Sequence, residues 1–177
     1  MELLLASLTV LAPTALLAVA LARWPRWATA AGAAGALLGC ALGLWPALAA
    51  LSGAEPQMRW TWPAPYGELA LGLDRLSAFF LVPVLVLSAI AALYGRGYLL
   101  GGKRRRGLGA AACFFNLLIA SMVLVVVARD AFTFLVGWEL VTLTSFLLVS
   151  FEHEEAEVRR AGWVYLIAGH VGGLALM

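Results

Sequence analysis

Long apolar stretches, separated by short charged segments, make up most of this chain. Charged side chains are absent from five stretches and occur once in a sixth, at Glu139; the stretches are 3–22, 27–54, 76–95, 107–128, 161–177 and 131–151. A membrane-spanning helix needs about 20 consecutive apolar residues, because the hydrocarbon core of a bilayer is about 30 Å thick. The apolar runs are continuous rather than alternating, which favours helices over the strands of a membrane barrel.

This pattern predicts an all-α integral membrane protein, a polytopic bundle of about six transmembrane helices that forms a single membrane domain over residues 1–177. The expected spans are 3–22, 28–51, 76–100, 107–128, 131–151 and 161–177, the last being either cut short or only just long enough. The composition agrees, because 63% of the residues are hydrophobic and 12% are charged. Soluble domains carry about 25% charged residues, so an ordinary soluble domain is excluded.

The basic residues gather in alternate connections between the spans. They are Arg23 and Arg26, Lys103–Arg106, and Arg159 and Arg160. Basic loops stay on the cytoplasmic side of a membrane, so we expect the N-terminus and the loop 52–75 to face outward. The Lys103–Arg106 loop also suits the headgroups of anionic lipids. The partner expected from this pattern is the lipid bilayer, and no nucleic acid is expected.

The outward loop contains a short strand pattern. Polar and aromatic residues alternate around Arg59–Trp62, which predicts a hairpin strand at the membrane surface. Pro63 and Pro65 follow directly and restrict this strand to an edge or a turn.

Small and polar residues inside the spans indicate helix packing. Gly35, Gly39 and Gly43 form a stripe at every fourth residue, which allows a neighbouring helix to approach closely. We interpret these glycines as structural and interfacial. Asn116 and Ser121 lie in the fourth predicted span, where we expect both to make contacts between helices.

Glu139 is the strongest candidate for a functional residue. A charged side chain at the centre of a bilayer costs about 2.5–3.5 kcal/mol on insertion scales, so it should face protein or water. Burial raises the pKa of a carboxyl group, whereas a nearby cation lowers it. A carboxyl group that experiences both effects can exchange a proton near neutral pH. Thr142, at the i+3 position, shares its helix face and could hold a water molecule. The structural alternative is a static ion pair, or a neutral glutamic acid that joins two helices.

His170 is the second candidate, about ten residues into the last predicted span. A histidine at this depth acts either as a proton relay or as a hydrogen-bonded contact between helices, and the sequence leaves both open. Residues 151–160 contain another histidine among four glutamates. Consecutive loop residues do not converge on one ion, so we expect a solvated loop and no metal site. The chain offers no ligand set for haem, an iron–sulfur cluster or flavin, and no cofactor is expected.

Four motifs in the second half of the chain resemble one known family. They are LGLDRLSAFFLVPVL (71–85), YGRGYL (94–99), FFNLLIASMVLVVVARDAFTFLVGWELVTLTSFLLVSF (114–151) and YLIAGHVGG (165–173). In this order they resemble the antiporter-like proton-translocating subunits of complex I, of sodium/proton antiporter complexes and of membrane-bound hydrogenases. The sequences of these motifs are most similar to those of hydrogenase-4 component B and the formate hydrogenlyase membrane subunit, over about residues 70–177.

The resemblance implies roles for two acidic residues. The glutamate that follows tryptophan in the fifth helix of the family is the acidic half of a proton-channel ion pair, and Glu139 occupies this position. The family aspartate at the start of the third helix matches Asp74 and implies a structural or interfacial role. The implied function is proton translocation without redox chemistry in this chain, within a respiratory or hydrogenase complex of a bacterial or archaeal inner membrane.

The sequence departs from the family in length. Family members have about fourteen helices and carry the lysine partner of the glutamate on the seventh, whereas this sequence stops at Met177. We therefore expect a fragment of a longer subunit, or another chain that supplies the missing helices. Two alternatives remain open at this point: a non-conducting membrane scaffold and a sodium/proton antiporter subunit.

Overall fold

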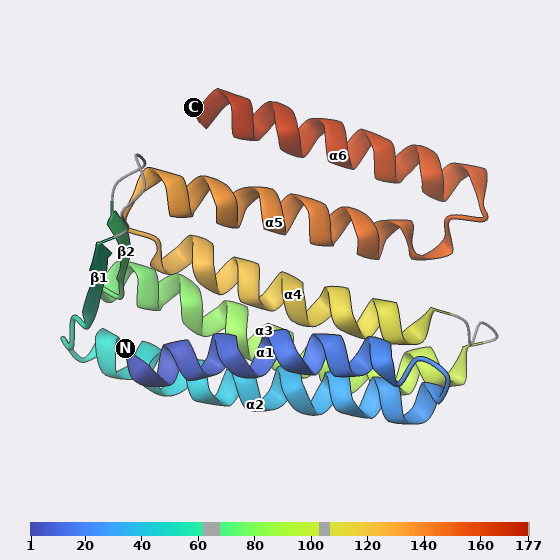
Figure 1. Ribbon diagram of the computed structural model, residues 1–177, viewed down its shortest axis with the longest axis horizontal. Helices are drawn as coiled ribbons and strands as arrows, with labels where there is room; N and C mark the ends of the chain where they lie inside the picture. Colours follow the sequence, from blue (N-terminus) through green and yellow to red (C-terminus); the bar gives the residue numbers. More distant parts are fainter. Residues whose placement is uncertain (62–67, 103–106, 177) are drawn as a thin grey trace.

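The computed structural model describes residues 1–61, 68–102 and 107–176, and most of them lie in long helices that run side by side (Figure 1). The six α-helices in this part of the chain are α1 (Glu2–Ala20), α2 (Pro25–Leu51), α3 (Arg75–Gly101), α4 (Leu108–Val127), α5 (Ala131–Val149) and α6 (Ala156–Leu176). Two short strands, β1 (Gln57–Thr61) and β2 (Glu68–Gly72), lie between α2 and α3, and the 3₁₀ turn η1 (Ser150–Glu152) precedes α6. The prediction of an all-α polytopic bundle is confirmed.

Five of these helices are long and apolar enough to cross a membrane. They are α1, α2, α3, α4 and α5, the last counted together with η1. The sixth predicted span corresponds to α6, which begins with Arg159 and Arg160 in its first turns and contains His170. These polar residues lower the hydropathy of α6 relative to the other five helices.

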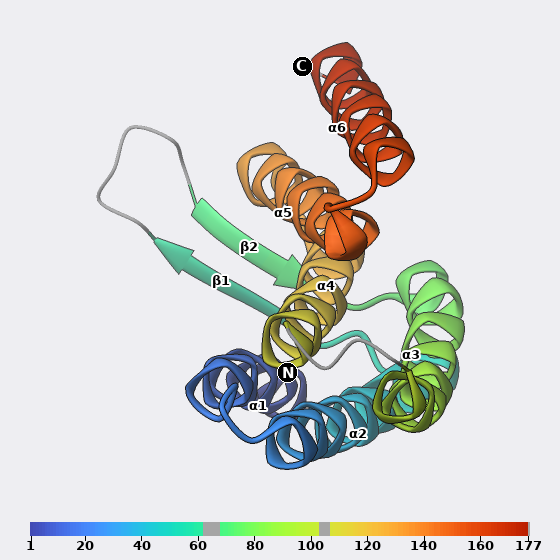
Figure 2. The same cartoon turned by 90° about the vertical axis from the view of Figure 1, so that its right-hand side faces the viewer.

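The helices pack around α4. This helix contacts α1, α2 and α3 on one side and α5 on the other, and α6 packs against α5 (Figure 2). Buried aliphatic side chains of the first four helices form the core, including Leu4, Leu11, Leu81, Leu85, Ile119 and Val123. The second half of the bundle is therefore thinner, and one face of α5 and most of α6 are exposed in this chain.

The two ends of the bundle differ in character. The N-terminus and the β1–β2 hairpin lie at one end, whereas the α1–α2 turn, the end of α3 and the start of α6 lie at the other (Figure 1). Arg23 and Arg159 are at this second end. The Lys103–Arg106 loop lies outside the described residues. The outward orientation of the N-terminus remains a prediction.

The strand predicted around Arg59 is confirmed. β1 pairs with β2 in antiparallel register, from Gln57 opposite Gly72 to Thr61 opposite Glu68. Pro63 and Pro65, expected to limit the strand, lie outside the described residues. A further bridge between Leu71 and Ala128 ties the hairpin to the turn between α4 and α5.

The glycine stripe of α2 faces other helices at close range. A methyl group on Gly35 would overlap the side chain of Thr14 in α1, and one on Gly39 would lie 2.7 Å from Cγ of Leu11. At Gly43 the nearest side chains are Leu85 of α3 and Ser7 of α1. Without side chains at these positions, α1 and α3 can approach the backbone of α2.

Buried polar side chains join the helices near this stripe. Ser7 Oγ donates a hydrogen bond to the carbonyl of Gly39 at 2.7 Å, and Asn116 Nδ2 donates one to Thr14 Oγ1 at 3.1 Å. The interhelical contact expected of Asn116 is confirmed. The expectation for Ser121 is wrong, because its hydroxyl donates to the carbonyl of Leu118 within its own helix, which satisfies the polar group locally.

We expect Gly35→Val to lower the free energy of unfolding by about 1–3 kcal/mol, because the added side chain overpacks the α1–α2 contact. Gly97→Val is the matched control on α3, since a methyl group there meets no atom within 4 Å. Thermal unfolding of the two purified variants in the same detergent measures the difference. Equal stability of the two variants would contradict the close packing of Gly35.

Candidate functional site

Glu139 lies in the middle of α5, and the path of the chain determines what faces it. Asp130 caps the start of α5 by accepting a hydrogen bond from the backbone N–H of Thr133 at 2.8 Å. After η1 the chain reverses, and α6 runs back along α5 (Figure 1). The middle of α6 is thereby brought beside Glu139.

Glycines of α6 allow it to lie close to α5 at this depth. A methyl group on Gly169 would overlap the side chain of Thr142, and one on Gly173 would lie 2.7 Å from Oε1 of Glu139. Trp138 Nε1 donates a long hydrogen bond, 3.5 Å, to the carbonyl of Gly169. The carboxylate of Glu139 is therefore held against the backbone of α6.

His170 is the partner of Glu139 in this chain. Its Nε2 lies 3.4 Å from Oε2 of Glu139. The His170 side chain is 52% exposed and the Glu139 side chain is 38% exposed. The pair therefore lies at an open face of the α5–α6 layer rather than in the α1–α4 core. The structure thus brings together two of the three candidate residues of the proton-translocation hypothesis.

The hydrogen bonds of His170 define how a proton can be placed in this pair. His170 Nδ1 lies 2.9 Å from the carbonyl oxygen of Leu166, which can only accept, so Nδ1 carries the hydrogen. Nε2 is then the ring nitrogen that faces Oε2 of Glu139. A hydrogen bond between the two side chains requires a hydrogen on one of these two atoms.

Thr142, the third candidate, has a different position. It is buried, and its side chain contacts the backbone of α6 at Gly169. In the described part of the chain, no hydrogen bond joins Thr142 to Glu139 or His170. Its observed contribution is to the α5–α6 contact, and its role in holding water remains a prediction.

A second polar cluster lies at the hairpin end of the bundle, around Asp74. The Asp74 side chain caps α3 by accepting a hydrogen bond from the backbone N–H of Ser77 at 2.7 Å. Its other oxygen lies 3.0 Å from Nη2 of Arg129, and the same Nη2 donates to Ser77 Oγ at 2.9 Å. Asp74 thereby connects the start of α3 to the turn between α4 and α5.

Asp130 makes the equivalent connection to the hairpin. Its Oδ2 accepts a hydrogen bond from the backbone N–H of Ala70 at 3.0 Å, while its Oδ1 caps α5. The backbone N–H of Arg129 donates to the carbonyl of Ala70 at 2.8 Å. We refer to Asp74, Arg129 and Asp130 as the end clamp.

The two carboxyl groups of the end clamp are stabilised as anions. The backbone N–H of Ser77 has the largest effect on Asp74 and lowers its pKa below the ordinary value of 3.8. Burial has the next largest effect and raises this pKa, but the Ser77 hydroxyl and the Arg129 guanidinium lower it further, so the net pKa is lowered. Burial is the largest influence on Asp130 and raises its pKa. The N–H groups of Thr133 and Ala70 together outweigh it, so the net pKa is lowered.

Sequence reasoning missed Arg129 and Asp130 as partners in this cluster. Both look like loop residues in the sequence, because the α4–α5 turn is only a few residues long. The available signal was the pair of similar segments Asp74-Arg75 and Arg129-Asp130, each placing an aspartate directly before a helix. In the described ranges, no three His, Cys, Asp or Glu side chains gather as a metal site would require.

Comparison with known proteins identifies homologues of about two thirds of this chain. It is 34% identical over 117 residues to hydrogenase-4 component B of Escherichia coli, covering 65% of this chain and 17% of that protein. It is 32% identical over 124 residues to NADH-quinone oxidoreductase subunit L of Mycobacterium tuberculosis, covering 68% and 19%. It is 32% identical over 107 residues to Na(+)/H(+) antiporter subunit A1 of Staphylococcus haemolyticus, covering 60% and 13%.

These relatives confirm the resemblance drawn from the four sequence motifs. The matched segment spans less than a fifth of the length of each of these three relatives. No protein-family model matches the chain.

The lowered pKa values of Asp74 and Asp130 predict acid-sensitive stability. The stabilisation from these anions is complete above the unfolded value of 3.8 and is lost as the pH falls through the lower folded values. Thermal unfolding measured between neutral pH and roughly pH 3 should show this loss. The double variant Asp74→Asn with Asp130→Asn keeps side chains that can cap a helix. In this variant the unfolding temperature should fall less as the pH is lowered toward about 3, and we call this fall the acid limb of the pH curve.

Glu55→Gln is the control, since Glu55 is exposed in the loop before β1. We expect it to leave the acid limb as steep as in the unsubstituted protein. The assignment is wrong if the double Asn variant and the control give the same pH dependence.

Proposed function

We propose that this chain, as a homologue of membrane subunits of hydrogenase-4 and NADH-quinone oxidoreductase, forms part of a proton-translocating membrane subunit in which Glu139 takes up and releases the proton. The observation that carries the proposal is the contact between Glu139 and His170 across α5 and α6. Ionisable groups within membrane helices are costly and rare, and proton relays are among the functional sites that they mark.

The proton moves between two facing atoms in this mechanism. Protonated Glu139 donates to Nε2 of His170, which leaves a carboxylate beside an imidazolium. The imidazolium keeps its other proton on Nδ1, hydrogen-bonded to the Leu166 carbonyl. Release of the Nε2 proton to a further acceptor returns the histidine to its neutral form, and Glu139 then accepts the next proton.

The direction of transfer depends on a cation that approaches or leaves the pair. A positive charge near Glu139 stabilises the carboxylate and favours release of its proton, and removal of the charge favours uptake. The pair is partly exposed on the open face of α5 and α6, where such a group has access to it. We propose that this cation belongs to helices not contained in these 177 residues. Thr142 would order water beside the pair.

The proposed setting is a multisubunit complex in a bacterial or archaeal inner membrane. The relatives named above are components or subunits of larger assemblies, which supports other membrane subunits as partners. Redox cofactors would belong to those partner subunits, and this chain would couple to them only through proton movement.

A structural scaffold is the second candidate function. The same Glu139–His170 contact can tie α5 to α6 without any proton transfer, and the glycines of α2 and α6 show that close helix packing is a major feature of the chain. Transport of sodium in exchange for protons is a variant of the first function, favoured by the match to an Na(+)/H(+) antiporter subunit.

Glu139→Gln should abolish proton translocation in the assembled complex while leaving membrane insertion intact, because the amide cannot accept and release a proton. The measurement is acidification of liposomes that contain the purified complex, followed with a pH-sensitive dye after substrate is added. Glu55→Gln is the matched control and should retain full translocation.

The carboxyl stretching band of Glu139 in infrared difference spectra separates the two candidate functions. A band that titrates in the unsubstituted protein and disappears in Glu139→Gln supports proton exchange. Unchanged liposome acidification by Glu139→Gln, or a band that never titrates, would favour the scaffold.

A further inference from the structure

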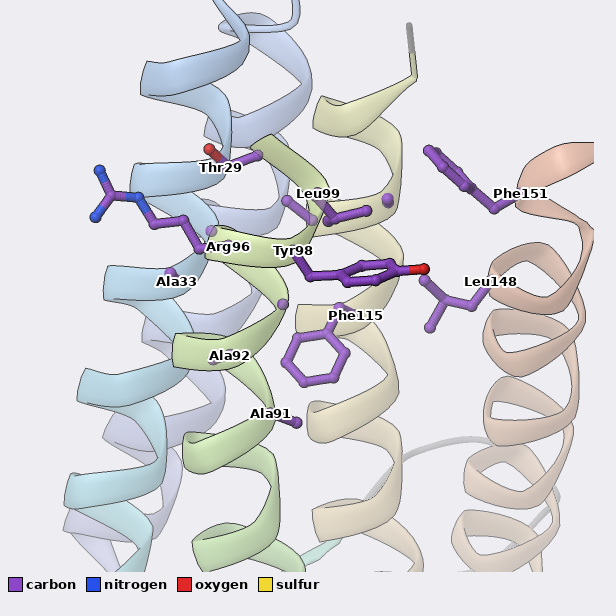
Figure 3. A pocket seen from close by; sticks show the side chains of 14 residues that line it. Thr29, Ala33, Ala91, Ala92, Arg96, Tyr98, Leu99, Phe115, Leu148 and Phe151 are labelled. Atoms are coloured by element: carbon purple, nitrogen blue, oxygen red, sulfur yellow. The ribbon is translucent and has the colours of Figure 1, made fainter. Parts of the chain in front are cut away.

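A cavity lies between the ends of α2, α3, α4 and α5, far along the helices from the hairpin. It has a volume of about 270 Å³. Its walls are small or apolar, with Gly32 and Ala33 from α2, Ala92 and Gly95 from α3, and Phe115 from α4 among the lining residues. The side chains of Tyr98, Leu148 and Phe151 lie on the α5 side (Figure 3). A cavity of this composition has too few polar partners to hold ordered water.

The last turns of α3 stand away from the bundle above this cavity. A methyl group on Gly95, Gly97 or Gly101 would meet no atom within 4 Å. A second cavity, of about 490 Å³, shares Tyr98, Leu99, Leu148 and Phe151 with the first and extends to Glu152 and Gly102 at the end of the helices. The first cavity is therefore continuous with a second one that reaches the ends of the helices, where the surface of a membrane would lie.

The length of the cavity along the helix axes matches the thickness of one leaflet of a bilayer. It extends from Ala91 to Leu99 on α3, and α3 ends at Gly101. The eleven residues of helix from Ala91 to Gly101 are separated by ten steps of 1.5 Å and span roughly 15 Å. This is about half of the hydrocarbon thickness of roughly 30 Å, which is the reach of an acyl chain from one side.

The charged residues of α2 and α3 beside the cavity are two arginines. Arg96 lies on its α3 wall with the guanidinium directed away from the cavity (Figure 3), and Arg26 is in the first turn of α2. Neither has an ion-pair partner among the residues that the structure describes. The sequence contains no acidic residue in 3–54 or in 75–102, so α1, α2 and α3 provide none at this end.

We propose that this cavity binds one acyl chain of an anionic phospholipid, whose headgroup is held by Arg96 and Arg26. The apolar walls exclude water, and the adjacent medium in a membrane supplies acyl chains. An unpaired arginine near the end of a membrane helix extends toward the headgroup region, where phosphate oxygens accept its hydrogen bonds. The site is separate from Glu139 and does not depend on proton translocation.

The experiment uses the protein purified with its co-assembled subunits, stripped of lipid and then supplied with phosphatidylglycerol or phosphatidylcholine. Native mass spectrometry counts the lipid that remains bound. We expect the unsubstituted protein to retain phosphatidylglycerol in preference to phosphatidylcholine. Gly95 lines the cavity, and a methyl group there meets no atom within 4 Å. Gly95→Leu therefore adds apolar volume to the cavity and should lower retention of both lipids by roughly tenfold.

Two further variants locate the site. Gly97→Leu adds the same side chain on the same helix outside the cavity and should retain lipid normally. Arg96→Gln should reduce retained phosphatidylglycerol to the level of phosphatidylcholine. Thermal unfolding of the two leucine variants verifies that both are folded.

The proposal is overturned by equal lipid retention in Gly95→Leu and the unsubstituted protein, or by an equal loss in Gly97→Leu. It is also overturned if Arg96→Gln leaves the preference for phosphatidylglycerol unchanged. An experimental structure of the complex that shows a polypeptide side chain or a quinone in the cavity would likewise exclude the lipid.

Discussion

The absence of water in the hydrocarbon region of a bilayer is the constraint on which this structure depends. Every polar group there must find a partner within the protein, because an unsatisfied group in lipid costs several kcal/mol. Two features of the chain reduce this cost. Polar side chains such as Ser7 and Asn116 donate hydrogen bonds to neighbouring helices, although Asn116 Oδ1 and Thr133 Oγ1 are buried without a partner among the described residues. The charged groups of the end clamp lie where helices begin.

Small residues make these internal contacts possible. Gly35 and Gly39 allow α1 to approach α2, which places Ser7 within reach of a backbone carbonyl. Gly169 and Gly173 do the same for α6 and α5, and there the approaching groups are Thr142 and Glu139. Glycines therefore allow close helix contacts in both halves of the bundle. In the first half the contact has no ionisable side chain, and in the second half it includes Glu139.

The sequence predicted the elements of this fold better than their contacts. The spans and the β1 strand follow from local patterns of apolar, alternating and turn residues, which need no knowledge of distant parts of the chain. Arg129 was missed because its partners, Asp74 and Ser77, are more than 50 residues away and no local pattern marks the pairing. Glu139 and His170 were singled out separately, since each is polar within an apolar run. Their contact depends on the α5–α6 register, which only the three-dimensional structure provides.

The carboxyl groups of this chain differ in how they are held, and this difference supports distinct roles. Asp74 and Asp130 each accept hydrogen bonds from backbone N–H groups that cannot move without unwinding a helix or strand, so both are fixed as anions. Glu139 accepts no backbone hydrogen bond in the described part of the chain, and the side chain that faces its carboxyl group is the imidazole of His170. A carboxylate held by rigid donors loses those bonds when it is protonated, whereas one that faces an imidazole can exchange a proton with it. The chain thus reserves rigid hydrogen bonding for the aspartates that organise the helix ends and leaves its mid-membrane glutamate beside a group that can share its proton.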